Sequence, residues 1–164
     1  ESSPWGLTAN DSDNTWEISS GNTMSNSSNL YMVFTEGTLD PGTYWATYWY
    51  ASNETDKNWI KWNRTDGKKI LIKKLDVFAD AYYYMVVKYL RLEGSDNGTS
   101  WTTLLLHQGY MYSNNVVTFN ISNNTSYNYI RLVFDSDWYD FDEDGIGDYS
   151  NPCMIRQIRA YKEQ

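Results

Sequence analysis

Four aspartates and a glycine near the C-terminus have the spacing of a calcium-binding loop. They lie in DSDWYDFDEDGIGDYSN (residues 135–151), where the glycine occupies the position that needs a sharp turn. Calcium takes six to eight oxygen ligands, and loops that bind it supply these from alternate positions. We therefore expect a Ca²⁺ ion held by four carboxylates and one backbone carbonyl, from Asp140, Asp142, Asp144, Ile146 and Asp148.

The twelfth position of this loop is Asn151, where a bidentate glutamate is usual, so weaker binding or a ligand from elsewhere is expected. The alternative is a solvated acidic turn, although so many carboxylates would repel one another without a counter-ion. The flanking runs, residues 127–134 and 153–161, are rich in β-branched and aromatic residues and have no helical start signal. The loop is therefore expected to join strands, unlike the loop of an EF-hand.

Length and composition limit the classes of partner. The 164 residues suit a single domain, and the net charge of −8 argues against nucleic acid, which is bound through excess Lys and Arg. A single cysteine, Cys153, excludes an internal disulfide, and no apolar run is long enough to span a membrane. Because Glu1 is not an initiator Met and no signal sequence precedes it, we expect a mature or excised fragment.

Short runs of β-branched and aromatic residues, separated by turn signals, predict an all-β chain, most simply an antiparallel sandwich or jelly roll. The Ser- and Asn-rich residues 1–29 are expected to be irregular. At residues 96–98, Asp-Asn-Gly predicts a hairpin turn, with Leu104 and Leu106 on one face of the second strand. The expected strands are 30–35, 44–50, 58–64, 69–78, 85–93, 101–107, 116–121, 127–134 and 153–161.

Several of these segments resemble the discoidin, or coagulation-factor C-type, domain, which is a galactose-binding-like β-sandwich. The resemblance is carried by VKYLRLEGSDNGTSWTTL (87–104), VVTFNISNNTSYNYIRLVF (116–134) and IRQIRAY (155–161), and by YMVFTEGTLDPGTYWAT (31–47) and NWIKWNRTDGKKILIKKLDV (58–77). The segment GSDNGTSW is similar to modules of bacterial carbohydrate-binding proteins and bacteriophage tail adhesins. The resemblance implies a structural calcium site whose acidic residues are replaced here by Thr35 and Gln157, so the inserted acidic loop is expected to hold the metal instead.

In relatives, ligands bind on loops at one end of the sandwich. The matching loops here are 51–58, 79–84 and the acidic loop, and they contain aromatic residues whose flat faces suit the C–H faces of sugar rings. Each aromatic residue has core or edge packing as its alternative. The expected ligand-binding residues are Tyr82, Tyr83, Tyr84, Trp138, Tyr139 and Phe141, with Asn53, Asp56 and Lys57 as polar partners.

No set of residues predicts an enzyme. His107 is the only histidine, and no reactive Cys or Ser/His/Asp set accompanies it, so it is expected to be a polar residue at a strand edge. The resemblance implies a non-catalytic module on the outside of a cell or virion that binds cell-surface glycan, and the spacing of the acidic loop adds a bound Ca²⁺ ion. The alternative is a structural or assembly domain of a virion or surface appendage, whose aromatic surface packs against other chains of a larger protein.

Overall fold

The computed structural model describes residues 16–21, 45–46, 59–79, 87–109, 111, 116–135 and 154–161. Within these residues all regular structure is β-strand, and none forms a helix that could cross a membrane. The expected all-β fold class is confirmed. The strands are β1 (Trp16–Ser20), β2 (Trp45–Ala46), β3 (Trp59–Arg64), β4 (Lys74–Ala79), β5 (Tyr89–Ser95), β6 (Thr102–Gln108), β7 (Val116–Asn120), β8 (Tyr129–Asp135) and β9 (Met154–Tyr161).

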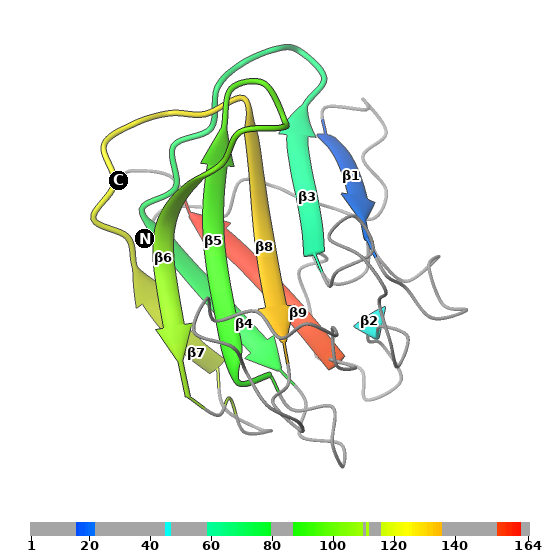
Figure 1. Ribbon diagram of the computed structural model, residues 1–164, viewed down its shortest axis with the longest axis vertical. Helices are drawn as coiled ribbons and strands as arrows, with labels where there is room; N and C mark the ends of the chain where they lie inside the picture. The colour runs from blue at the N-terminus through cyan, green and yellow to red at the C-terminus, as the bar shows by residue number, and fades with distance from the viewer. Residues whose placement is uncertain are drawn as a thin grey trace.

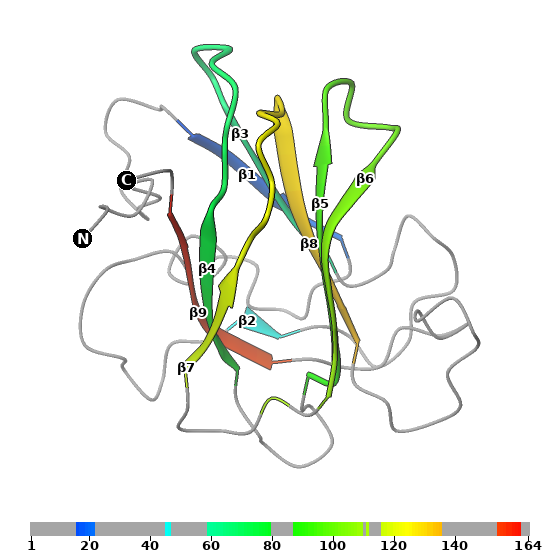
Figure 2. The same ribbon diagram turned by 90° about the vertical axis from the view of Figure 1, so that its left-hand side faces the viewer.

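The strands form two antiparallel sheets that pack face to face. The larger sheet has the order β1-β3-β8-β5-β6, and the smaller has the order β2-β9-β4-β7. In Figure 1 the larger sheet lies in front of the smaller one, and Figure 2 shows the two layers from the side. The chain is an antiparallel β-sandwich, as the sequence predicts.

The core lies between the sheets and follows from the alternation of side chains along each strand. On β3, Ile60 and Trp62 are fully buried, and their neighbours along the strand point to the opposite face. The other apolar side chains of the interior come from both sheets. The larger sheet adds Leu90, Leu92, Ile130 and Leu132, and the smaller adds Leu75, Val77, Phe119, Ile155, Ile158 and Ala160.

The observed strands agree with the predicted runs within a few residues, with two main differences. Strand β1 lies in a segment predicted to be irregular because it is rich in Ser and Asn. Its Ile18 nevertheless packs in the core. Strand β4 begins at Lys74 rather than at residue 69, since residues 69–73 leave the sheet. In this stretch Ile70 instead exchanges two backbone hydrogen bonds with Tyr127, at 2.8 and 2.9 Å. The predicted strand 30–35 lies outside the described residues.

The β5–β6 hairpin forms where Asn-Gly predicts it, and Gly98 has the positive φ of 75° that this residue tolerates. One expected face is wrong. Leu105, not Leu106, lies opposite the buried Leu92, and Leu106 is 53% exposed. The reason is a β-bulge between Leu92 and Glu93, which shifts the register of β6 by one residue.

Candidate functional site

The predicted metal and ligand residues all lie outside the described part of the chain. For the metal these are Asp140, Asp142, Asp144, Ile146 and Asp148, and for the ligand Tyr82, Tyr83, Tyr84, Trp138, Tyr139, Phe141, Asn53, Asp56 and Lys57. They therefore remain predictions. Among the described residues, no group of three or more His, Cys, Asp or Glu side chains could hold a metal ion.

The strand ends that flank the three predicted loops meet at one end of the sandwich. Loop 51–58 precedes β3, residues 80–86 follow β4, and residues 136–153 follow β8. Trp59 near the start of β3 pairs with Val133 near the end of β8, and Ala79 at the end of β4 pairs with Ile155 near the start of β9. Both views show the lower ends of β4, β8 and β9 at the bottom of the sandwich, with the start of β3 above them (Figures 1 and 2). We call this the loop end.

The outer face of the larger sheet carries charged and aromatic side chains that the core does not use. Lys61 on β3 lies directly opposite Arg131 on β8, which in turn lies opposite Glu93 on β5. All three alternate with buried apolar residues and point away from the core. We call Lys61, Arg131 and Glu93 the charged row, and it crosses three neighbouring strands at right angles to them.

Glu93 holds two arginines in place. Its Oε1 lies 3.2 Å from Nε of Arg91 and 3.1 Å from Nε of Arg131. The Glu93 side chain is only 6% exposed, whereas the two arginine side chains are 22% and 24% exposed. Of the two, Nε of Arg131 donates a hydrogen bond to Glu93, whereas Nε of Arg91 is buried and makes no hydrogen bond within the described residues. The terminal nitrogens of Arg131 lie outside this hydrogen bond. A guanidinium fixed in this way presents donors in a planar fork that matches a carboxylate.

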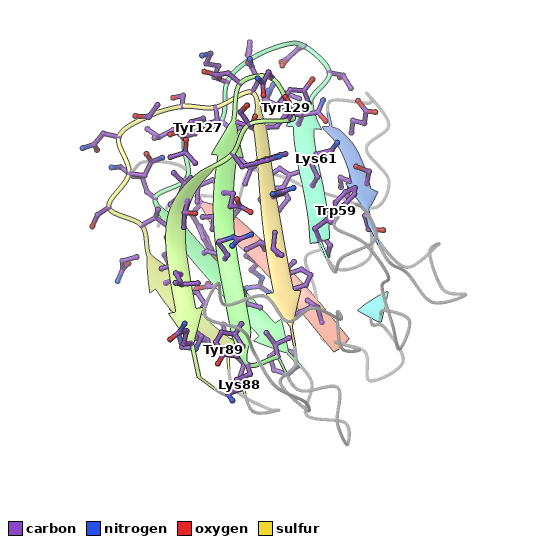
Figure 3. The ribbon with its side chains drawn as sticks, viewed as in Figure 1. Trp59, Lys61, Lys88, Tyr89, Tyr127 and Tyr129 are labelled. Carbon is purple, nitrogen blue, oxygen red and sulfur yellow. The ribbon has the colours of Figure 1, made fainter. Side chains whose placement is uncertain are left out.

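Three aromatic rings surround the charged row. The Lys61 Nζ lies 5.5 Å from the ring centroid of Trp59 and 5.9 Å from that of Tyr129, and Figure 3 shows Lys61 between these two residues on the face of the sheet. The Arg131 guanidinium lies 4.1 Å from the ring centroid of Trp101. Such cation–π contacts restrict the motion of the Lys61 and Arg131 side chains, while the rings remain partly exposed to solvent.

The opposite end of the sandwich is less suited to binding because its polar groups bind one another. Asp96 accepts hydrogen bonds from the ammonium of Lys69 at 3.0 Å and from the backbone N–H of Asn128 at 3.3 Å. The hydrogen bond from Lys69 is the main cause that lowers the pKa of Asp96 from its ordinary value. The carbonyl oxygen of the Asn97 side chain likewise accepts from the backbone of Thr99 and Ser100.

The outer face of the smaller sheet is also internally neutralised. The Thr118 hydroxyl donates to Asp76 at 2.7 Å, and the Lys74 Nζ lies 4.5 Å from the ring centroid of Tyr161. Burial, followed by the hydrogen bond with Asp76, raises the pKa of Tyr161. Asp76 lies directly opposite Arg159 on β9 and two residues from Lys74 on β4, so the described part of this face has no two cations directly opposite each other.

The position of His107 agrees with a packing role. Its ring, which lies on the edge strand β6, packs edge-on against Phe119 with centroids 5.1 Å apart and an interplanar angle of 62°. Phe119 belongs to the smaller sheet, so this contact joins the two sheets.

Lys88 and Tyr89 form a further cation–π pair at the loop end, where the Lys88 Nζ lies 5.4 Å from the ring centroid of Tyr89 (Figure 3).

Sequence reasoning missed the charged row and its aromatic neighbours. The available signal was the alternation in WIKWNR (59–64) and YIRLVF (129–134), where apolar residues alternate with charged or aromatic ones. This pattern gives the face of each residue but not the neighbouring strand. Strands β3 and β8 are far apart in the sequence, so only their pairing brings Lys61 beside Arg131.

Comparisons with known proteins support the fold. No protein-family model matches the chain, and neither does any curated protein. Among solved structures, a Clostridium perfringens module named CpGH89CBM32-6 matches with a TM-score of 0.59 and 16% identity, over 95% of this chain and 99% of that one. CpGH89CBM32-5 from the same organism, in complex with GalNAc-β-1,3-galactose, has a TM-score of 0.60 and 14% identity, over 94% and 98%.

A third match is the CBM32 of AlyQ in complex with 4,5-unsaturated mannuronic acid, with a TM-score of 0.60 and 12% identity, over 90% of this chain and 95% of that one. At such low identity the likeness concerns the fold. It confirms the galactose-binding-like sandwich that the sequence segments predict, while the similarity to phage adhesins stays a prediction. The chain therefore has the β-sandwich fold of these carbohydrate-binding modules.

Proposed function

We propose that this chain is a non-catalytic carbohydrate-binding module that attaches to cell-surface glycan through its loop end. The observation that carries the proposal is the meeting of the strand ends around Trp59, Ala79 and Asp135, which anchor the three predicted loops. Loops that leave a sandwich at one end can build a single surface on a rigid scaffold. A glycan-binding site of this kind needs no catalytic group.

The residue types in these loops suit a sugar. The aromatic residues Tyr82 to Tyr84, with Trp138 and Tyr139, offer flat apolar faces, while Asn53, Asp56 and Lys57 offer hydrogen-bonding groups. Aromatic faces contact the C–H surface of a sugar, and a few polar groups fix its hydroxyls. The solved relatives support the ligand class: one is in complex with GalNAc-β-1,3-galactose, and another is described as a pectin-binding module.

The proposed calcium ion would order the acidic loop. Asp140, Asp142, Asp144 and Asp148 supply hard oxygen ligands, and a loop ordered beforehand loses less entropy when it binds a glycan. In this proposal the ion shapes the site rather than contacting the sugar. We place the module outside the cell or on a virion surface, as part of a larger protein.

An assembly role is the second candidate, and the exposed aliphatic residues favour it. Leu106 on β6 and Val116 on β7 are each 53% exposed, and each lies on the edge strand of its sheet. Apolar residues on edge strands are typical of surfaces that pair with another chain. Sedimentation at increasing protein concentration distinguishes the two roles, because an assembly domain associates and a binding module remains monomeric.

A glycan-array screen, run once with calcium and once with excess chelator, tests the proposed function. Binding to a defined sugar in calcium alone supports both the glycan site and the role of the acidic loop. Binding in both conditions supports the glycan site and makes the metal at most structural. Absence of binding in both conditions overturns the proposal in favour of the assembly role.

A further inference from the structure

We propose a second glycan site on the outer face of the larger sheet, separate from the loop end and selective for sugars that carry carboxylates. Lys61 and Arg131 of the charged row would bind the carboxylate, and the rings of Trp59 and Tyr129 would contact the sugars. The ligand class is an oligosaccharide built from uronic acids. The proposal goes beyond the function at the loop end. Apart from Trp59, whose backbone lies at the start of β3, it depends on different residues.

Charge complementarity is the first argument. The whole chain carries a net charge of −8, yet Arg91 and Arg131 pair with Glu93 and Lys61 lies opposite Arg131 on the next strand, so these four residues together carry a charge of +2. Glu17 also lies on this face, but on the edge strand β1. Positive charge concentrated on one face attracts anionic ligands there, whereas the negative charge of the rest of the protein repels them. An anion on this face therefore has a favoured position over the charged row.

The second argument is that Arg131 is already oriented. Its Nε is held by Glu93 at 3.1 Å, and its guanidinium stacks on Trp101 at 4.1 Å. The side chain consequently loses little conformational freedom when its terminal nitrogens bind a carboxylate. Lys61 lies directly opposite Arg131 on β3, with the two backbones about 5 Å apart, so both cations project from neighbouring positions on the same face.

The third argument concerns the flat surfaces beside the cations. Trp59 pairs with Val133, and Tyr129 lies four residues away from Val133 along β8, so the two backbone positions are roughly 13 Å apart along the strands. Their ring centroids lie closer together, because they are 5.5 and 5.9 Å from the same Lys61 Nζ. Both are partly exposed, and Lys61 lies between them (Figure 3). A short oligosaccharide along β3 and β8 would contact an aromatic face on each side of the charged row. The repeated C–H faces of successive sugar rings suit two flat surfaces with a cation between them.

The test is calorimetric titration of the whole chain with oligogalacturonate and, as a neutral match, with the same oligosaccharide after methyl esterification. We expect saturable binding of the acidic form, weaker binding of the ester, and loss of affinity as salt concentration rises. Lys61→Gln should weaken binding of the acidic form about tenfold, because a hydrogen bond between charged groups is lost. Equal affinity for the acid and the ester would overturn the proposal.

Lys74→Gln is the matched control. It removes the same charge and the same kind of contact, with Tyr161 at 4.5 Å, from the outer face of the other sheet. We expect its affinity for oligogalacturonate to equal that of the unaltered chain. An equal loss in both variants would show that net charge alone matters, and would contradict a site at Lys61. Thermal unfolding of both variants checks that each remains folded.

Variants at the loop end separate this inference from the proposed function. Trp138→Ala combined with Tyr139→Ala should leave oligogalacturonate binding unchanged. If that double variant loses binding and Lys61→Gln does not, acidic sugars bind at the loop end and the second site is wrong, while the proposed function stands. If the chain binds neutral sugars but not oligogalacturonate, the second site is likewise wrong and the proposed function stands. The chain could also form a dimer that Lys61→Gln disrupts and fail to bind oligogalacturonate. That result would mean that this face binds an acidic segment of a second copy, and it would also overturn the proposal.

Discussion

Lys61 and Arg131 lie directly opposite each other on adjacent antiparallel strands, with both side chains on the outer face of the sheet. Like charges at such a position normally destabilise a sheet. Glu93 lies opposite Arg131 on its other side and accepts its Nε–H at 3.1 Å, so the carboxylate offsets part of the repulsion. The stability of this face therefore depends on one nearly buried carboxylate.

Glu93→Gln is expected to lower the free energy of unfolding by about 2 kcal/mol. Loss of one partner in a buried ion pair costs more than this, but the arginines here are partly exposed and water screens them. Urea denaturation near neutral pH measures the change, and added salt should restore part of it. Glu17→Gln is the control, since the exposed Glu17 accepts only a weak hydrogen bond from Asn63, and it should cost less than about 0.5 kcal/mol. Equal losses in the two variants would contradict this account.

Gly94→Ala is expected to destabilise the fold by about 1–3 kcal/mol, because the new Cβ would overlap the ring of Tyr127. Combined with Tyr127→Ala, the substitution should cost less than the sum of the two single changes, since the smaller side chain leaves room. Gly67→Ala is the control. Gly67 has open space but a φ of 73°, so its cost of about 1–2 kcal/mol should not depend on Tyr127. Additive effects for Gly94 and Tyr127 would contradict the predicted overlap.

Asp96 is expected to make stability depend on pH in the acidic range. Because the pKa of Asp96 is lowered in the folded state, its contribution is present above the ordinary pKa of 3.8 and is lost as pH falls through the folded value. Asp96→Asn should therefore be less stable than the unaltered chain at about pH 7, and this difference should narrow below about pH 4. Lys69→Gln, which removes the main partner, should behave in the same way. Thermal unfolding across this pH range measures the difference in stability between Asp96→Asn and the unaltered chain. A difference that stays constant with pH would contradict a lowered pKa of Asp96 in the folded state.

The two sheets follow largely from local sequence, whereas the face that carries the charged row does not. The β-branched and aromatic runs 58–64 and 127–134 predict strands β3 and β8 to within two residues. The predicted face of Leu106 is wrong because a bulge depends on cross-strand contacts that no single strand encodes. The charged row escapes prediction for a similar reason, since its three members come from strands joined only by tertiary pairing.

Asp142→Ala combined with Asp144→Ala is expected to lower the melting temperature in calcium and to change nothing in chelator. An ion present at about 100 times its Kd stabilises the fold by about 2.7 kcal/mol, which corresponds to roughly 5–10 °C for a chain of this length. Differential scanning calorimetry measures the shift. Asp137→Ala is the control, because Asp137 belongs to the same acidic segment but lies outside the alternating set, and it should leave the calcium-dependent shift unchanged. Equal losses in calcium and chelator would mean that the carboxylates do not bind the ion.

Calorimetric titration with the neutral glycan that binds most strongly on the array tests glycan recognition at the loop end most directly. We expect saturable binding with one site per chain, weakened more than about tenfold by Trp138→Ala combined with Tyr139→Ala. Lys74→Gln, on the far sheet face, should leave the affinity unchanged. No saturable heat with any glycan, or an affinity that the loop-end variant does not alter, would contradict the account.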